Sequence, residues 1–213
     1  MTIALLMENS QAAKNALVEG ALRKVVEPLG HTVRNYGMYS PEDKAQLTYV
    51  QIGILAAVLL GSGAAEFVVT GCGTGEGAML ACNSFPGVIC GLIEDPLDAY
   101  TFAQINDGNA VAIPFAKGFG WGGELNLEYI FEKLFSEPSG QGYPRERAIP
   151  EQRNKRILDE VKAHTYKDLP HILPALDRNL VLGALSGERF KEYFFSDCKN
   201  DKIKALVEKI LKK

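Results

Sequence analysis

Short apolar segments alternate with amphipathic ones through the first two thirds of the chain. The apolar runs predict five strands, at residues 2–6, 31–36, 66–70, 87–92 and 109–113. Apolar positions at helical spacing predict helices at 11–27, 41–60, 77–83 and 96–105, and a last one from 116 or 122 to 135. Wholly apolar strands suit a parallel sheet that helices cover on both faces. The pattern therefore predicts an α/β domain over residues 1–135, with a doubly wound parallel five-stranded sheet in three layers.

The pattern changes after residue 135. Residues 136–150, SEPSGQGYPRERAIP, are rich in Pro, Gly and Ser, which is typical of a linker or a wrapping loop. A charged helix is predicted at 151–164, and short apolar helices follow up to the amphipathic end, DKIKALVEKILKK. We expect residues 136–213 to form a linker and a helical extension that packs on the domain or on a partner chain.

Composition and charge narrow the functional class. Apolar residues make up 46% and charged residues 23%, the mix of a globular protein, and the net charge of −3 gives no reason to expect a nucleic acid or an anionic membrane as partner. The longest apolar stretch, residues 52–60, is too short to span a bilayer, and the first residues lack the basic start of a signal peptide. We therefore expect a cytoplasmic enzyme or binding protein.

The four cysteines argue against a metal site. No pair has the CxxC spacing of zinc or thioredoxin-like chemistry, and in a cytosolic chain free thiols are expected. The cysteines are Cys72, Cys82, Cys90 and Cys198.

One segment has the composition of a ligand-binding loop: GCGTGEG, residues 71–77, which joins the third predicted strand to the next helix. Glycines allow close backbone approach, and amides at a helix start form an anion site. No Gly-Lys-Ser/Thr follows, as in a P-loop, and glycines at every second position do not fit a dinucleotide fingerprint. Ligands of doubly wound sheets bind beyond the carboxyl ends of the strands, so we expect this loop to meet residues 7–10 and 94–95 there.

Cys72 is the reactive candidate of this loop. A helix start favours the thiolate, which can act as a nucleophile or as a base that removes a proton. The alternative is a buried structural cysteine. Thr74 is a candidate for the site or for a cap of the next helix, and Glu76 is either solvated or a second acid/base.

Several motifs together resemble the ribose-5-phosphate isomerase B and galactose-6-phosphate isomerase family: GCGTGEGAMLACNSFPG at 71–87, DP at 95–96, IND at 105–107, and Asn109. The resemblance covers residues 2–163. It implies a Rossmann-like fold and aldose–ketose isomerisation without a metal or another cofactor. It also implies a homodimer, or a dimer of dimers, in which two chains share each active site.

The resemblance assigns roles to residues. Cys72 matches the base that removes the proton next to the sugar carbonyl and returns it to the neighbouring carbon. Asn106 and Asp107 match a segment whose asparagine contacts the sugar, and Tyr49 falls where the family has a substrate-facing tyrosine. The loop whose amides hold the enediolate oxygen corresponds to Gly73, Thr74, Gly75 and Gly77, and we add the adjacent Gly71 and Glu76 as substrate-binding candidates.

The chain departs from the family at two histidines. Glu8 and Asn9 replace an Asp-His pair after the first strand, and Ile105 replaces the histidine that helps to open the sugar ring. We expect Glu8 to join Cys72 and Thr74 in catalysis, Asn9 to bind substrate, and either Glu8 or Asn106 to serve the second substrate oxygen. A substrate that is already open needs no ring opening, and some longer members of the family act on unphosphorylated 4-deoxy-5-keto uronates.

The anionic end of the substrate has arginine candidates. The family holds its phosphate with arginines near its C-terminus, and of the arginines at 145, 147, 153 and 156 only Arg156 aligns well. In a uronate isomerase, Arg145 and Arg147 of YPRER would hold a carboxylate by bidentate contacts. The alternative is that YPRER is a solvated loop that binds no ligand.

A second class of function stays open beside the isomerase of a sugar phosphate or sugar acid. A non-catalytic sensor of these compounds would explain the missing histidines, but it would not need the thiol. Flavin or nucleotide binding fits less well, because the loop after the first strand lacks a phosphate-binding Ser/Thr/Gly cluster.

Overall fold

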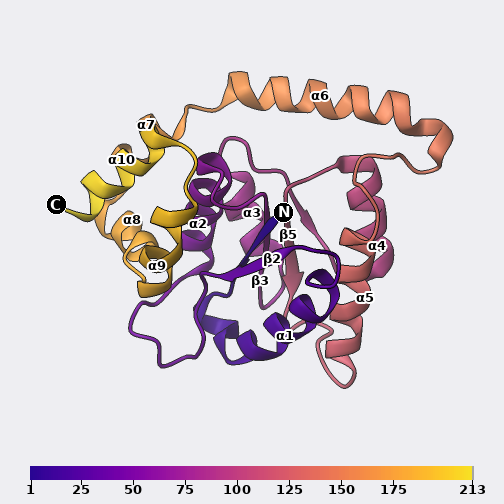
Figure 1. The fold of residues 1–213 in the computed structure, drawn as a ribbon, viewed down its shortest axis with the longest axis horizontal. Helices are drawn as coiled ribbons and strands as arrows, with labels where there is room; N and C mark the ends of the chain where they lie inside the picture. The colour runs from indigo at the N-terminus through magenta and orange to yellow at the C-terminus, as the bar shows by residue number, and fades with distance from the viewer. Residues whose placement is uncertain (213) are drawn as a thin grey trace.

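In the computed structural model, which describes residues 1–212, five parallel strands form one sheet in the order β2-β1-β3-β5-β4 (Figure 1). The register places Leu6 beside Thr70 and Cys72 beside Pro114, so the central strands end together at one edge. All five predicted strands are present, as β1 (Thr2–Leu6), β2 (Thr32–Asn35), β3 (Phe67–Cys72), β4 (Cys90–Leu92) and β5 (Ala110–Pro114).

Helices cover both faces of this sheet. Ile3 and Leu5 of β1 pack in one apolar core with α1 (Asn15–Val26), α4 (Pro96–Thr101) and α5 (Gly123–Phe135). Ala4 and Leu6 point to the opposite face, into the core that holds α2 (Tyr49–Ser62) and α3 (Glu76–Asn83). This alternation follows from the two-residue period of a strand. The predicted three-layer α/β fold is confirmed.

The helix predicted from Pro41 is wrong over its first eight residues, because α2 begins at Tyr49. Thr48 and Gln51 form a capping box: the Thr48 hydroxyl accepts from the Gln51 N–H at 3.4 Å, and the Gln51 side chain accepts from the Thr48 N–H at 2.8 Å. The preceding segment turns instead, with the Asp43 carboxylate accepting from the Tyr39 N–H at 2.7 Å.

Two further helices differ in type. The segment predicted as one helix at 11–27 begins as a 3-10 helix, η1 (Asn9–Lys14), before α1. The segment predicted at 96–105 changes after α4 into a π-helical turn, η2 (Phe102–Asn106). Such π-turns often occur at functional sites.

The C-terminal helices cover α2. They are α7 (Leu169–Ile172), η4 (Leu173–Ala175), α8 (Arg178–Leu185), α9 (Glu188–Asp197) and α10 (Asp201–Leu211), and Figure 1 shows them gathered beside α2. Residues 51–59 of α2 are consequently buried all round the helix. On α9, the buried rings of Phe190 and Phe194 stack with their centroids 4.6 Å apart. The division of the chain at residue 136 stays a prediction.

One long helix connects the helices that cover the sheet to the C-terminal helices. After η3 (Arg145–Arg147), α6 (Ala148–Thr165) runs along one side of the molecule (Figure 1), and none of residues 148–165 is buried. Its exposed apolar side chains are Ile149, Ile157, Leu158 and Val161. At its end, the Tyr166 hydroxyl donates to the carbonyl of Asn83 at 2.9 Å. Within residues 1–212, no helix has both the length and the hydropathy needed to cross a bilayer.

Candidate active site

The glycine loop leaves the sheet at the carboxyl end of β3. Gly71 lies so close to β5 that a Cβ there would be 2.1 Å from the carbonyl oxygen of Ile113, so the sheet itself requires a glycine. Gly75 begins α3 with φ of +77°, and a Cβ on it would lie 2.5 Å from the Leu92 side chain. By contrast, the Cβ position of Gly73 has no neighbour closer than 3.8 Å. A ligand could therefore approach the backbone at Gly73.

The start of α3 has its first amides free of a side-chain cap. Gly75 is the N-cap residue, and in this described turn no side chain accepts from the first-turn N–H groups. Of the two roles predicted for Thr74, the cap of the next helix is therefore wrong. Free N–H groups at a helix start attract an anion or an oxygen that gains negative charge.

Cys72 is the last residue of β3, directly before these amides. Its side chain is only about 9% exposed, and its Sγ lies 4.0 Å from the hydroxyl oxygen of Thr74, which is exposed. The cysteine is a free thiol. The fold thus places a nucleophilic atom, a hydroxyl and a helix start side by side at the edge of the sheet.

Tyr49 lies against this loop from the side of α2. Its ring is 3.3 Å from the Cβ position of Gly77, and its side chain is half-exposed. The capping box that begins α2 at Tyr49 explains this position. The structure therefore brings Tyr49 and the glycine loop together, while Glu76 is exposed at the first turn of α3.

Glu8 and Asn9 lie at the neighbouring carboxyl end of β1. Glu8 is buried, and its carboxylate accepts from the Ser10 N–H at 2.9 Å and from the Ser10 hydroxyl at 2.6 Å. Glu8 thus caps η1, which is a structural reason for its position. The Asn9 N–H donates to the carbonyl of Leu47 at 2.8 Å.

Two polar residues near the glycine loop were not predicted as site residues from the sequence. Gln11 Nε2 lies 3.9 Å from the Cβ position of Gly73, and Lys14 Nζ donates to Gln11 Oε1 at 2.6 Å and to the carbonyl of Phe115. Both residues belong to η1, whose 3-10 geometry directs them towards the glycine loop. The apolar spacing that predicted a helix here gave no signal for that direction.

The loop after β5 adds charge beside the site. The N–H groups of Ala116 and Lys117 donate to the carbonyl of Gly73 at 3.0 and 2.9 Å. The Lys117 ammonium pairs with Glu94 at 2.6 Å, and this hydrogen bond raises the pKa of Lys117. Residues 7–10, 71–77 and 94–95 thus follow the carboxyl ends of β1, β3 and β4, and their meeting in one site stays a prediction. Among residues 1–212, no group of three or more His, Cys, Asp or Glu side chains could hold a metal ion.

Asn106 and Asp107 lie at the opposite edge of the sheet. They precede β5, whose five residues at about 3.3 Å each separate them from Cys72 by roughly 15 Å. Asp107 has a left-handed backbone with φ of +47°, and its carboxylate accepts from the Ser139 hydroxyl. Asp107 and Arg156 line one cavity of about 310 Å³ between η2 and α6.

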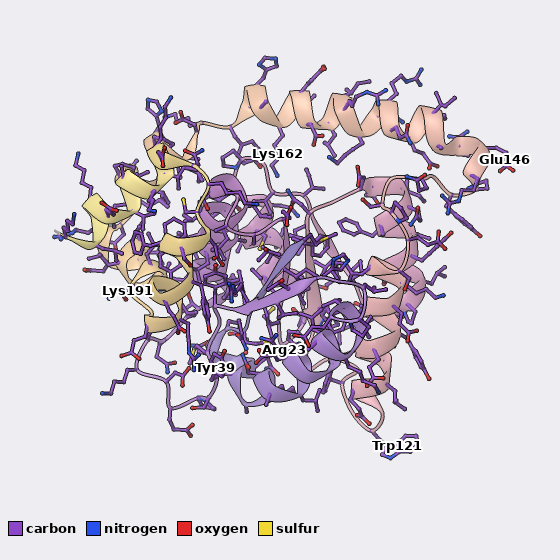
Figure 2. All side chains as sticks on the ribbon, in the orientation of Figure 1. Arg23, Tyr39, Trp121, Glu146, Lys162 and Lys191 are labelled. Carbon is purple, nitrogen blue, oxygen red and sulfur yellow. The ribbon has the colours of Figure 1, made fainter. Side chains whose placement is uncertain are left out.

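The other predicted arginines lie near the start of α6. Arg145 pairs with Glu137 at 2.5 Å, and Arg147 is exposed. Figure 2 shows Glu146, between them, at the upper right, at the end of α6 that lies away from the C-terminal helices, and Trp121 of the β5–α5 loop at the lower right. The predicted site residues thus form two groups in one chain, one with Cys72 and one with Asn106 and the arginines.

Comparison with known proteins agrees with this architecture. The family model described as Ribose/Galactose Isomerase matches residues 3–135, and a second model, described as Ribose-5-phosphate isomerase, matches residues 164–210. The chain is similar to a 4-deoxy-L-threo-5-hexosulose-uronate ketol-isomerase whose crystal structure is complexed with a tartrate. The identity is 57%, each chain is covered over 100%, and the TM-score is 0.98.

A ribose-5-phosphate isomerase from Vibrio parahaemolyticus is similar over 99% of both chains, with 53% identity and a TM-score of 0.97. The type B ribose 5-phosphate isomerase of Trypanosoma cruzi shares the fold at 18% identity and a TM-score of 0.65. It matches over 98% of its own length but only 78% of this chain. The two relatives above 50% identity match this chain over its whole length, including the C-terminal helices.

Proposed function

Because the chain belongs to the ribose/galactose isomerase family, and is an aldose–ketose isomerase, we propose that its substrate is the sugar acid 4-deoxy-L-threo-5-hexosulose-uronate. The observation that carries this proposal is a retained thiol at a site whose two family histidines are replaced by Asn9 and Ile105. The chain's three histidines lie elsewhere: His31 contacts Phe135, His171 pairs with Asp168, and His164 is exposed on α6.

The reaction needs a base and a site for negative charge. We propose that the Cys72 thiolate removes the proton from the carbon next to the carbonyl, which gives an enediolate, and returns it to the neighbouring carbon. The first-turn amides of α3 and the Thr74 hydroxyl stabilise the oxygen that gains negative charge. The buried Glu8 carboxylate is the candidate for moving the proton of the second oxygen. No atom is gained or lost, so the step balances as an isomerisation.

The substitutions of the histidines favour the uronate over ribose 5-phosphate. A pentose phosphate is largely a closed ring, and its opening needs an acid and a base. The hexosulose-uronate exposes its carbonyl more readily than a pentose phosphate does. Its turnover should therefore depend little on the two histidines that Asn9 and Ile105 replace. The uronate ketol-isomerase is also 57% identical over the whole chain, compared with 53% for the Vibrio parahaemolyticus ribose-5-phosphate isomerase.

We propose that arginines bind the carboxylate of the substrate. Arg156 lines a cavity with Asp107, and Arg147 is exposed at the start of α6, so both have donors available to a ligand. Tartrate, which is bound in the structure of the uronate ketol-isomerase, is itself a hydroxy acid with carboxylates. Arg145 would have to exchange its partner Glu137 for the ligand.

We propose that two chains build each active site in a homodimer. Within one chain, Asn106 and the arginines lie away from Cys72, towards the opposite edge of the sheet. The exposed apolar side chains of α6 also have no partner among residues 1–212. A two-fold dimer can bring the group with Asn106 and the arginines of one copy to the group with Cys72 of the other copy. The symmetry then forms two such sites in each dimer. A dimer of two such pairs would keep the same sites.

A reducing compartment fits the thiols. The four cysteines of the chain are free, and a free catalytic thiol is preserved best where disulfides do not form. We propose a cytoplasmic location on this ground.

The test is a turnover screen by NMR. The protein would be offered 4-deoxy-L-threo-5-hexosulose-uronate, ribose 5-phosphate and galactose 6-phosphate in D₂O, with Cys72→Ala as the control. We expect isomerisation of the uronate alone, and incorporation of solvent deuterium at the carbon that is reprotonated. Turnover of a sugar phosphate alone would overturn the substrate assignment. Binding without turnover of any compound would instead support a sensor.

A further inference from the structure

The loop between β5 and α5 takes no part in the mechanism above, although it begins on the catalytic loop. Its first residue, Phe115, donates its N–H to the carbonyl of Cys72, and Ala116 and Lys117 donate theirs to the carbonyl of Gly73. Residues 117–122 then read KGFGWG before α5 begins. The loop is therefore fixed beside Cys72 at one end and joined to a rigid helix at the other.

Trp121, the single tryptophan of the chain, lies in this loop. Its side chain is fully exposed, at 104% of the reference value, and Figure 2 shows it at the tip of the loop, directed away from the body of the molecule. An indole gains much free energy from burial, so an exposed indole on a loop that is fixed to the catalytic loop is available to cover a ligand there.

The residues around Trp121 allow it to move. Gly118 and Gly122 have positive φ values of +68° and +79°, with Gly120 between them. Phe119 is held, because its ring packs against Phe115 with the Lys14 ammonium 5.1 Å from its centre. Trp121 comes two residues after Phe119, a chain reach of up to about 7 Å from that anchor, and Gly120 between them allows the indole to turn back over the loop.

The space under the loop has the lining of a sugar site. A cavity of about 200 Å³ lies between the loop and the ends of β4 and β5, and Trp121, Lys117, Asn126 and Glu94 line it. An aromatic face beside amide and charged groups suits a ligand with C–H groups on one side and hydroxyls on the other. The opening is on the same edge of the sheet as Cys72.

We propose that Trp121 folds over the bound substrate and stacks on its carbon chain, and that it thereby determines affinity for the sugar acid. This inference rests on the proposed function. Substrate is a better occupant than a second copy, because the loop is tied to Gly73 and lines a polar cavity at the catalytic edge. A hinge of glycines also suits a part that moves in each catalytic cycle better than a permanent subunit contact.

The single tryptophan makes this inference directly measurable. Fluorescence emission of the Cys72→Ala variant would be recorded while 4-deoxy-L-threo-5-hexosulose-uronate is added, with the two sugar phosphates in parallel titrations. We expect emission typical of an exposed indole without ligand, and a saturable shift to shorter wavelength with the uronate. Emission that is already blue-shifted without ligand, and red-shifts on dilution of the protein, would place Trp121 in a subunit contact and overturn the inference.

Kinetics supply the second measurement. Loss of one stacking contact corresponds to a roughly two- to tenfold rise in KM. We expect a rise of this size for Trp121→Ala, with kcat little changed. Trp121→Phe should restore part of the lost affinity. Tyr129→Ala, which removes another exposed aromatic side chain from α5, is the matched control and should leave KM unchanged.

The outcomes separate the two proposals. Turnover of the uronate by the wild-type protein, with unchanged emission and an unchanged KM in Trp121→Ala, would overturn the inference and leave the proposed function standing. If the wild-type protein turns over none of the three sugars, the proposed function fails. The emission titrations then decide the role of Trp121 alone: a saturable shift supports stacking on that sugar, and no shift with any of them overturns it.

Discussion

At the scale of single residues, the chemistry proposed for the site rests on Cys72. It is nearly buried, yet it borders the exposed Thr74 and the first turn of α3. We expect Cys72→Ala to lower kcat/KM by roughly 10³-fold while thermal unfolding stays near that of the wild-type protein, because the change removes a single side-chain atom. Steady-state kinetics and circular dichroism measure both. Cys198→Ala, which removes a thiol outside the site, should stay active, and substantial residual activity of Cys72→Ala would disprove the role as base.

Lys162 is a second residue with a measurable electrostatic signature. Burial lowers its pKa, while the nearby Cys90 and Asp159 oppose that shift, and its ammonium lies against the carbonyls of Asn83 and Val88. The unfolded chain therefore binds this proton more tightly than the folded one. The contribution of Lys162 to stability should then rise with pH between its folded pKa and the ordinary value of 10.5.

Urea unfolding of the wild-type protein and Lys162→Met at pH 8 and pH 10.5 tests this sign. The difference in unfolding free energy, wild type minus variant, should be more positive at the higher pH. The pKa of Cys90 is raised, chiefly by its hydrogen bond to Cys82, and the charge of Lys162 opposes that shift, so the loss of this charge in the variant changes the difference in the same direction. An equal difference at both pH values would contradict the assignment.

At the scale of elements, the stability of α2 depends on the C-terminal helices. Phe194 of α9 is fully buried, stacked on Phe190 and edge-on to Phe195. We expect Phe194→Ala to lower the free energy of unfolding by about 3–5 kcal/mol, because it leaves a cavity in the core that α2 shares with the C-terminal helices. Leu97→Ala, at a side chain that is 67% exposed, should change it by less than about 0.5 kcal/mol. Chemical denaturation measures both, and equal effects would show that the extension packs loosely.

At the scale of the whole molecule, the separation of Cys72 from Asn106 predicts complementation between chains. Cys72→Ala and Asn106→Ala should each be inactive alone. After the two are unfolded together and refolded, random pairing gives mixed dimers with one intact site each, so roughly a quarter of all sites should work. Activity recovered on mixing measures this. Two Cys72→Ala preparations refolded together are the control, and an inactive mixture with dimers present would disprove shared sites.

Much of the fold could be predicted from the sequence, because burial on both faces leaves a local trace. Strands β1 to β5 are short apolar runs, and a parallel sheet with helices on both faces is the arrangement that buries them. The glycine loop was also visible, since Gly71 and Gly75 occupy positions where a side chain would collide with β5 or Leu92. The start of α2 could not be placed from periodicity, because the apolar face lies at residues 52–59 and the capping box at Thr48 sets where the helix begins.

The sequence by itself determined the order of strands and helices and the position of Cys72 in a glycine loop between a strand and a helix, since these depend on neighbours along the chain. The tertiary structure decided which candidates meet. It placed Tyr49 on Gly77, brought Gln11 to Gly73 and Lys14 to Phe115, and put Asn106 at the far edge of the sheet. The reason is physical: direction and distance across a sheet are set by register and crossover connections, which couple residues far apart in sequence.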